Sequence, residues 1–82
     1  MDVKKWLIDW FVRNTDVSEE ELLRHETDNY FERGYIDSFV FITLIGDIEE
    51  ELGITLNNDQ FEDRSFSTIA GMSRILKEAL SK

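Results

Sequence analysis

The chain has 82 residues, a formal net charge of −9 and no cysteine. A chain of this length buries one small hydrophobic core, so we expect a single domain over residues 1–82 without disulfides or thiolate metal sites. Its negative charge makes nucleic acid an unfavourable partner, and the lack of a long apolar run or export signal predicts a cytoplasmic protein with no membrane span.

The first predicted element is an amphipathic helix over residues 3–14. Its apolar residues recur at three- and four-residue spacing, at Val3, Trp6, Leu7, Trp10 and Phe11. The charged residues mostly fall away from this stripe. Two tryptophans four residues apart could form a ligand-stacking surface, but a stripe at helical spacing favours the core. We therefore interpret Trp6 and Trp10 as core residues.

A long connection over residues 15–36 follows. The pattern Ser18-Glu19-Glu20-Glu21 resembles a capping box and predicts one or two helical turns. The remainder is expected to be irregular, with His25 as a surface loop residue and Gly34 allowing a left-handed or tight turn. Because long loops in compact domains need anchors, we expect apolar side chains to pin this one to the core, namely Val17, Leu22, Leu23, Tyr30 and Phe31.

A second long helix is predicted to begin near Ser38. Asp37 is a suitable N-cap, because its carboxylate can accept from first-turn amides, and Gly53 suits the C-terminal cap. Apolar residues at helical spacing predict the core face, with Ile42 at its flank; they are Phe41, Leu44, Ile45, Ile48 and Leu52.

The opposite side of this helix carries Phe39, Thr43, Gly46 and Glu50, with Asp47 nearby. Phe39 is expected to be an exposed aromatic beside an exposed serine, which favours a contact with a partner. Residues 34–63 contain no lysine or arginine and are rich in acids. This acidity has two open interpretations, a solvated surface or a surface that steers basic partners.

Two further helices complete the expected fold. Asn57 or Asn58 is predicted to cap a short helix that turns Phe61 inward, and Ser67 is predicted to cap a final helix. That last helix keeps its apolar residues at helical spacing, at Ile69, Met72, Leu76 and Leu80. The predicted fold is all-α, a bundle of three longer helices and one short one with a core from the three longer ones.

Ser38 has no catalytic apparatus in the sequence around it. Asp37 is already explained by capping, and adjacent side chains at a helix start point in different directions, so no base is oriented toward the hydroxyl. One histidine and no cysteine give no metal motif, and there is no Gly-rich phosphate loop. By elimination, the serine is a residue that is acted upon.

The stretch Gly34-Tyr35-Ile36-Asp37-Ser38-Phe39 resembles the phosphopantetheine attachment motif of acyl carrier proteins, in which Asp-Ser opens the second helix of a four-helix bundle. The likeness extends to the aromatic first helix, the long loop, the acidic run 49–51 and residues 66–69. It implies a non-catalytic, monomeric carrier. A phosphopantetheinyl transferase would join 4'-phosphopantetheine from coenzyme A to the Ser38 hydroxyl, with Asp37 as part of the motif. The thiol of this arm would hold an acyl group as a thioester.

The resemblance also implies a partner face on the second long helix. Phe39 would give a central apolar contact, while Asp47, Glu50 and Glu51 would steer the basic docking surfaces of partner enzymes. Thr43 and Gly46 lie on the same face. The implied partners are the transferase, an acyl-loading ligase or synthase, and acyl-transfer enzymes.

The motif differs from that of fatty-acid carriers in two positions. Gly34 stands four residues before the serine instead of three, and Phe39 follows it in place of leucine. This form is closer to specialised carriers. A carrier for fatty-acid, polyketide or related biosynthesis, an aminoacyl or D-alanyl carrier, and an unmodified helical interaction module therefore stay as alternatives.

Overall fold

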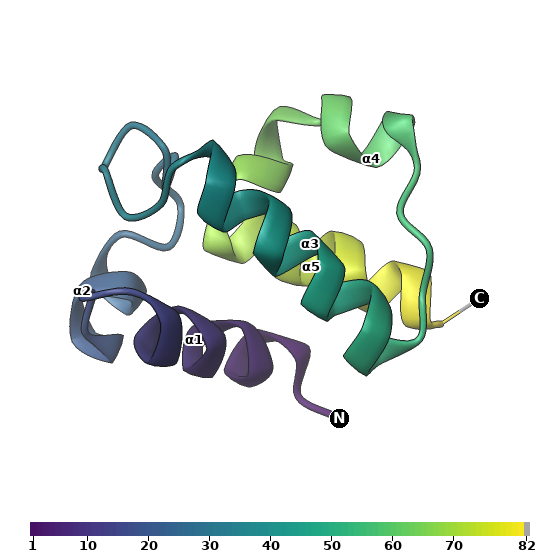
Figure 1. The fold of residues 1–82 in the computed structure, drawn as a ribbon, viewed down its shortest axis with the longest axis horizontal. Helices are drawn as coiled ribbons and strands as arrows, with labels where there is room; N and C mark the ends of the chain where they lie inside the picture. The colour runs from purple at the N-terminus through teal and green to yellow at the C-terminus, as the bar shows by residue number, and fades with distance from the viewer. Residues whose placement is uncertain (82) are drawn as a thin grey trace.

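The computed structural model describes residues 1–81 and is helical without a strand over that range (Figure 1). Three long helices, α1 (Val3–Asn14), α3 (Ser38–Leu52) and α5 (Ile69–Leu80), confirm the predicted all-α bundle. Shorter elements lie between them: α2 (Glu19–Arg24), α4 (Asn58–Glu62) and the 3-10 turn η1 (Arg64–Ser67). The one or two turns predicted after Ser18 are α2, and the short helix of the predicted bundle is α4, so η1 is the element that was not predicted.

Side-chain caps set the starts of the helices, largely as predicted. The Asp37 carboxylate accepts from the Val40 amide at 2.9 Å and starts α3. Asn57 starts α4 with a reciprocal capping box to Gln60. Gly53 ends α3 in the left-handed region, at φ 67°, a conformation that glycine adopts without strain.

The predicted cap of the last helix was wrong by one residue. Thr68 caps α5, and its hydroxyl accepts from the Gly71 amide at 2.9 Å. Ser67 instead closes η1, and its backbone carbonyl accepts from the Tyr30 amide at 2.9 Å. The reason is η1 itself, a turn capped by Asp63 that the sequence pattern did not reveal.

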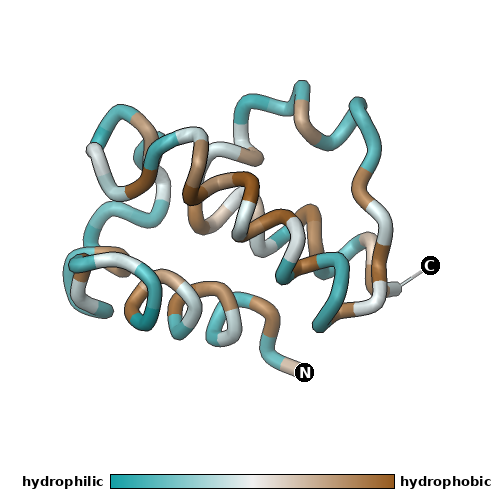
Figure 2. Tube along the Cα trace, viewed as in Figure 1, coloured by the Kyte–Doolittle hydropathy of each residue, from teal (hydrophilic) through white to brown (hydrophobic). Residues whose placement is uncertain are grey.

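The core lies where α1, α3 and α5 face one another (Figure 2). Each of them contributes side chains that are almost wholly removed from water, among them Leu7, Phe11, Leu44, Ile48, Met72 and Leu76. Trp10 is buried as predicted, whereas Trp6 is only half-buried against the core. Burial of these apolar side chains is the main stabilising contribution to the bundle.

The loop between α2 and α3 is anchored by part of the predicted set. Leu22 and Tyr30 are fully buried, but Leu23 is 44% exposed because α2 is too short to bury both of its faces. The Tyr30 hydroxyl donates to the Phe66 carbonyl at 2.6 Å, which ties the loop to η1.

His25 and Phe61 also differ from expectation. His25 is half-buried at the end of α2, and its Nδ1 lies 2.9 Å from an Asp28 carboxylate oxygen, so it helps to order the loop. Phe61 is 40% exposed, since only part of its ring packs inward, edge-on against Phe66 with centroids 5.4 Å apart.

Candidate functional site

Ser38 is exposed and is the first residue of α3. The backbone before it reverses at Gly34, which has φ 77°, a region that favours glycine. The Ile36 side chain is buried, which anchors the segment to the core immediately before the helix. With Ile36 pointing inward and Asp37 turned onto the helix end, Ser38 is left at the surface.

Ser38 supplies a hydroxyl that could act as a nucleophile, but among residues 1–81 no base is placed to activate it. Asp37 is engaged by the Val40 amide, and the His25 ring is engaged by Asp28 and Arg33. Over residues 1–81, the structure shows no hydrogen bond that would activate the Ser38 hydroxyl. The start of α3 also offers backbone amides that have no acceptor within the helix. A phosphate ester on Ser38 fits this position, because an anion is stabilised at the positive end of a helix.

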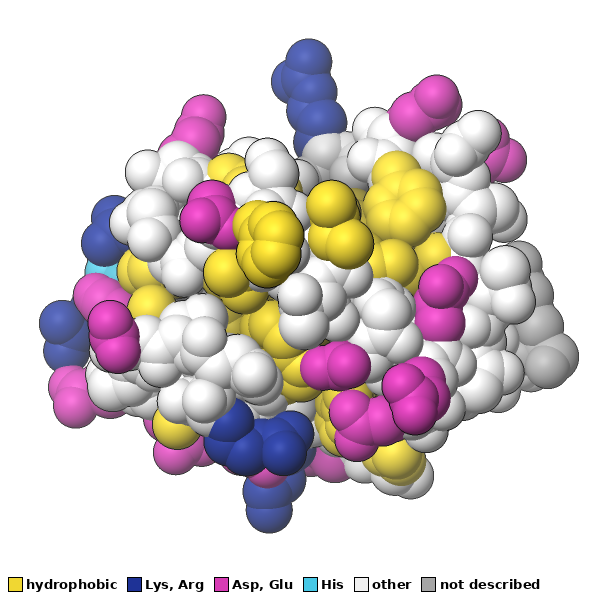
Figure 3. All heavy atoms as spheres, in the orientation of Figure 1, with side chains coloured by type: hydrophobic (Ala, Val, Ile, Leu, Met, Phe, Trp, Pro, Cys, Tyr) yellow, Lys and Arg dark blue, Asp and Glu magenta, His cyan; other side chains and the backbone are white. Residues whose placement is uncertain are grey.

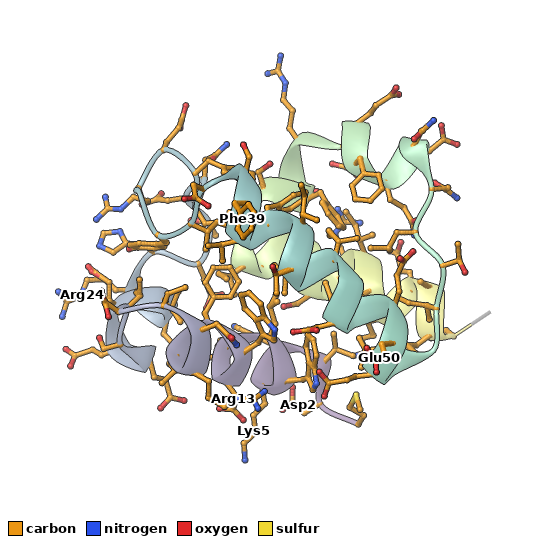
Figure 4. The ribbon with its side chains drawn as sticks, in the orientation of Figure 1. Asp2, Lys5, Arg13, Arg24, Phe39 and Glu50 are labelled. Carbon is orange, nitrogen blue, oxygen red and sulfur yellow. The ribbon has the colours of Figure 1, made fainter. Side chains whose placement is uncertain are left out.

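An apolar surface adjoins Ser38, made by Phe39, Ile42 and Phe61. These side chains are 80%, 70% and 40% exposed. Figure 3 shows hydrophobic side chains gathered over the start of α3 and beside α4, and Figure 4 places Phe39 pointing outward from the first turn of α3. The exposure of Phe39 was predicted, whereas Ile42 was expected at the flank of the core face and lies largely in water.

The acidic residues of α3 divide into two groups. Asp47 is half-buried and accepts from the indole Nε1 of Trp10 at 2.7 Å, and Glu49 accepts from the Leu56 amide at 3.1 Å. Both carboxylates thus take part in the fold. Glu50 and Glu51 are exposed, and no ion pair holds either within the part of the chain that the structure describes. Figure 3 shows a group of acidic side chains toward the far end of α3, the end at which Figure 4 labels Glu50.

The structure brings most of the predicted partner residues to one face. Thr43 and Gly46 are exposed between Phe39 and Glu50, and the Thr43 hydroxyl donates to the Phe39 carbonyl at 3.4 Å. Asp47 is the exception, because its carboxylate turns toward α1. The Trp10–Asp47 bond was missed, although a buried tryptophan usually finds an acceptor for its N–H.

Among residues 1–81, no group of three or more histidine, cysteine or acidic side chains is placed to hold a metal ion. None of the described helices combines the length and the hydropathy needed to cross a bilayer.

Comparison with known proteins identifies the family. A protein-family model described as the phosphopantetheine attachment site matches residues 5–76. Neither the curated proteins nor the solved structures gave a match. The matched segment runs from α1 into α5 and includes the exposed serine. Proteins of this family carry covalently bound 4'-phosphopantetheine. The chain belongs to the phosphopantetheine attachment-site family and is a phosphopantetheine carrier protein.

Proposed function

We propose that Ser38 is the attachment residue and that the protein carries acyl groups between enzymes as a single carrier unit. The observation that supports this most is an exposed serine hydroxyl at the first position of α3, directly after the Asp37 cap. On attachment, the Ser38 oxygen bonds to the phosphorus next to pantetheine while the pyrophosphate bond of coenzyme A breaks and adenosine 3',5'-bisphosphate leaves. The hydroxyl proton passes to a base on the transferase, since no base among residues 1–81 is aimed at Ser38.

The residues of the chain hold and present the arm. The amide end of α3 stabilises the phosphate, and Asp37 keeps the first turn of that helix ordered. The arm supplies a thiol, which carries the acyl group as a thioester. Apart from the Ser38 oxygen that receives the arm, the protein supplies no reacting group in this proposal and acts as a substrate of its partners.

Docking, we infer, uses the apolar surface for contact and Glu50 and Glu51 for steering. Large exposed aromatic side chains are the usual anchors of an interface, and exposed charges mainly affect the rate of encounter. Asp47 contributes less, because it is bonded to Trp10. The partners are a phosphopantetheinyl transferase, an acyl-loading ligase or synthase, and acyl-transfer enzymes with basic docking surfaces.

For the pathway, the motif favours a specialised carrier. Gly34 and Phe39 depart from the fatty-acid pattern in the same short stretch, which keeps an aminoacyl or D-alanyl carrier as the second candidate. The two candidates differ in the loading enzyme. An amino acid loaded onto the arm by an ATP-dependent ligase supports the second candidate, and loading by an acyl synthase or acyltransferase supports the first.

The attachment is tested by intact mass after incubation with coenzyme A and a broad-specificity transferase. The wild type is expected to gain one phosphopantetheine, and Ser38→Ala is expected to gain none. Ser18→Ala is the matched control, since Ser18 is another exposed serine at the start of a helix, where it is the N-cap of α2. It should gain the arm as the wild type does. The proposal is contradicted if Ser38→Ala gains the arm, or if the wild type gains no arm with any of several transferases.

The docking face is tested by the initial rate of that modification. Phe39→Ala and Ile42→Ala should each lower the rate about tenfold, the equivalent of about 1.4 kcal/mol at an anchor contact. Val12→Ala is the control, because Val12 is 42% exposed on α1. Glu50→Lys should slow modification at low salt and have little effect at high salt. Unchanged rates in the α3 variants contradict the assigned face.

A further inference from the structure

Aromatic rings pack directly behind the turn of α3 that begins with Ser38. Tyr30 and Phe66 are buried, Phe31 and Phe41 are half-buried, and Phe61 is 40% exposed. Phe41 is at the centre of this packing, with its ring centroid 5.2 Å from that of Phe31, 6.2 Å from Phe66 and 6.4 Å from both Tyr30 and Phe61. These rings come from the loop before α3, from α3, from α4 and from η1. We call these five residues the aromatic cluster.

The aromatic cluster continues to α1. Tyr30 packs against Phe11 at 5.5 Å, and Phe11 packs edge-on against Trp10 at 5.7 Å. Tyr30, Phe11 and Trp10 are each 1% exposed or less. Protein interiors are packed as densely as organic crystals, so a contiguous set of rings leaves little room for a further chain.

The elements around the cluster are fixed to one another by polar contacts and close packing. The Tyr30 hydroxyl and amide donate to the Phe66 and Ser67 carbonyls at 2.6 and 2.9 Å. On the other side of η1, Gly71 of α5 lies so close that a Cβ there would collide with the Ser65 backbone. Opening the bundle at this point therefore breaks a buried hydrogen bond as well as ring contacts.

Two surface hollows lie away from Ser38. One of about 400 Å³ is lined by residues that include Val3, Leu52 and Leu80, and another of about 380 Å³ is lined by Leu52, Ile54 and Leu80 among others. Both lie at the C-terminal end of α3. With a rise of 1.5 Å per residue, this end is about 20 Å along the helix from Ser38.

We propose that the acyl group borne by the arm stays outside the bundle, so that the cargo is a short or polar acyl group. The proposal rests on attachment at Ser38. Entry of a long alkyl chain between α3 and its neighbours requires the rings around Phe41 to separate, and extra methylenes in a filled core force strain. A long chain left outside exposes its methylenes to water, which is unfavourable, whereas a short or polar group avoids this exposure.

The test compares two arms that differ only in chain length. The wild type is loaded with acetyl- or dodecanoyl-phosphopantetheine from the corresponding coenzyme A derivatives, and intact mass establishes that each form is complete. We expect the acetyl and dodecanoyl forms to have equal midpoints of thermal unfolding. Their NMR chemical shifts should also agree at the backbone amides of Phe41, Leu44 and Phe66. Shifts confined to Phe39, Ile42 and exposed loop residues also support the proposal. A higher midpoint for the dodecanoyl form, with shifts at the three core positions, overturns it.

Cavity variants provide the positive control. Phe41→Ala removes the central ring, and Phe61→Ala removes a ring that is 40% exposed and is the milder change. In a variant that folds, the dodecanoyl arm is expected to raise the midpoint above that of the acetyl arm. This gain shows that the assay detects an enclosed chain. A cavity variant that folds yet matches the wild type in every shift overturns the assignment of these rings as the barrier.

An acyl group attached chemically, without a transferase, distinguishes failure of this proposal from failure of the proposed attachment at Ser38. The chain has no cysteine, so Ser38→Cys introduces a unique thiol. Its thiolate displaces the leaving thiolate from a mixed disulfide of N-acetyl- or N-dodecanoyl-cysteamine, which forms one new S–S bond as the old one breaks. The same midpoints and shifts are then measured. Failure of enzymatic loading contradicts attachment at Ser38, whereas enclosure of the dodecanoyl group on Cys-linked protein contradicts exclusion from the bundle.

Discussion

At the scale of the residue, Asp37 and Ser38 are neighbours with different tasks. The Asp37 side chain folds back onto the helix and satisfies the Val40 amide, while Ser38 is exposed. The acid therefore orders the turn that presents the hydroxyl. This division explains why a serine beside a carboxylate has no hydrolytic partner.

Replacing the cap tests this division. Asp37→Ala should lower the free energy of unfolding by about 0.5–2 kcal/mol, because an amide at the start of α3 loses its acceptor. Asp37→Asn keeps a side-chain oxygen and should retain most of the stability. Thermal unfolding of the three proteins measures both effects. If Asn is as destabilising as Ala, the negative charge matters and the acceptor does not.

The residues around the serine were predictable because their roles depend on local backbone geometry. Gly34 and Asp37 act within a few residues of their own positions, so the sequence pattern was sufficient for both. The role of Asp47 could not be predicted, since it depends on where α1 crosses α3. Only the packed structure places the Trp10 indole 2.7 Å from that carboxylate.

At the scale of the element, two contacts set how the helices lie against one another. Gly71 lets α5 approach η1, and the Trp10–Asp47 bond joins α1 to α3. Both contacts link segments that are separated in the sequence. Each can be altered by one substitution that has a matched control elsewhere in the chain.

The two helical glycines that lack a positive φ form a matched pair. Gly71→Ala should destabilise the protein by about 1–3 kcal/mol, because the new methyl group collides with the Ser65 backbone. Gly46→Ala should stabilise it by about 0.5–1 kcal/mol, since a Cβ there meets nothing within 4 Å and alanine favours a helix. Urea unfolding measures both. Equal effects at the two positions would show that η1 does not constrain α5.

The contribution of the link between α1 and α3 is measured by a double-mutant cycle with Trp10→Phe and Asp47→Ala. We expect a coupling of about 1–2 kcal/mol, because the indole donates to a charged acceptor that is partly exposed. Glu50→Ala, at an exposed acid, should change stability by less than about 0.5 kcal/mol. Additive effects of Trp10→Phe and Asp47→Ala would mean that the hydrogen bond between the two side chains contributes nothing measurable to stability.

Short elements were the least predictable part of the fold. Ser67 and Thr68 are both suitable caps, and the choice between them is made by η1, whose position depends on Tyr30 and Gly71. Leu23 was expected to be an anchor, but it is exposed because a helix of six residues buries one side only. Both outcomes follow from tertiary contacts that local patterns do not contain.

At the scale of the whole molecule, a bundle rich in aromatic side chains presents Ser38, the proposed attachment residue, at its surface. The overall fold was predictable, because three amphipathic stripes with caps permit few arrangements. The pairing of the rings was not, since it depends on how α3, α4 and η1 meet. Figure 4 also shows Lys5 and Arg13 on α1 away from Phe39 and Glu50 on α3, so the proposed partner face stands apart from these basic side chains.

Tyr30 makes global stability dependent on pH in alkaline solution. Burial raises the pKa of Tyr30, whereas the unfolded chain releases that proton near pH 10. The unfolded state therefore binds fewer protons above pH 10, so this contribution to stability is present below that pH and is lost as the pH rises beyond it. Urea unfolding at pH 9 and pH 11 measures the loss.

Tyr30→Phe is the control for this pH effect. At pH 9 it should be less stable by about 1–3 kcal/mol, because the Phe66 carbonyl loses a buried donor. Between pH 9 and pH 11 its stability should fall less than that of the wild type. Parallel losses in the two proteins would assign the alkaline decline to other groups.

The central claim, that Ser38 carries the arm, is tested most directly by locating the modification in the wild-type chain. After incubation with coenzyme A and a transferase, the protein is digested and each peptide is sequenced by fragmentation mass spectrometry. We expect one phosphopantetheine per chain, on Ser38 in the peptide that contains Asp37 and Phe39. An arm on any other residue, or no arm with any of several transferases, would contradict it.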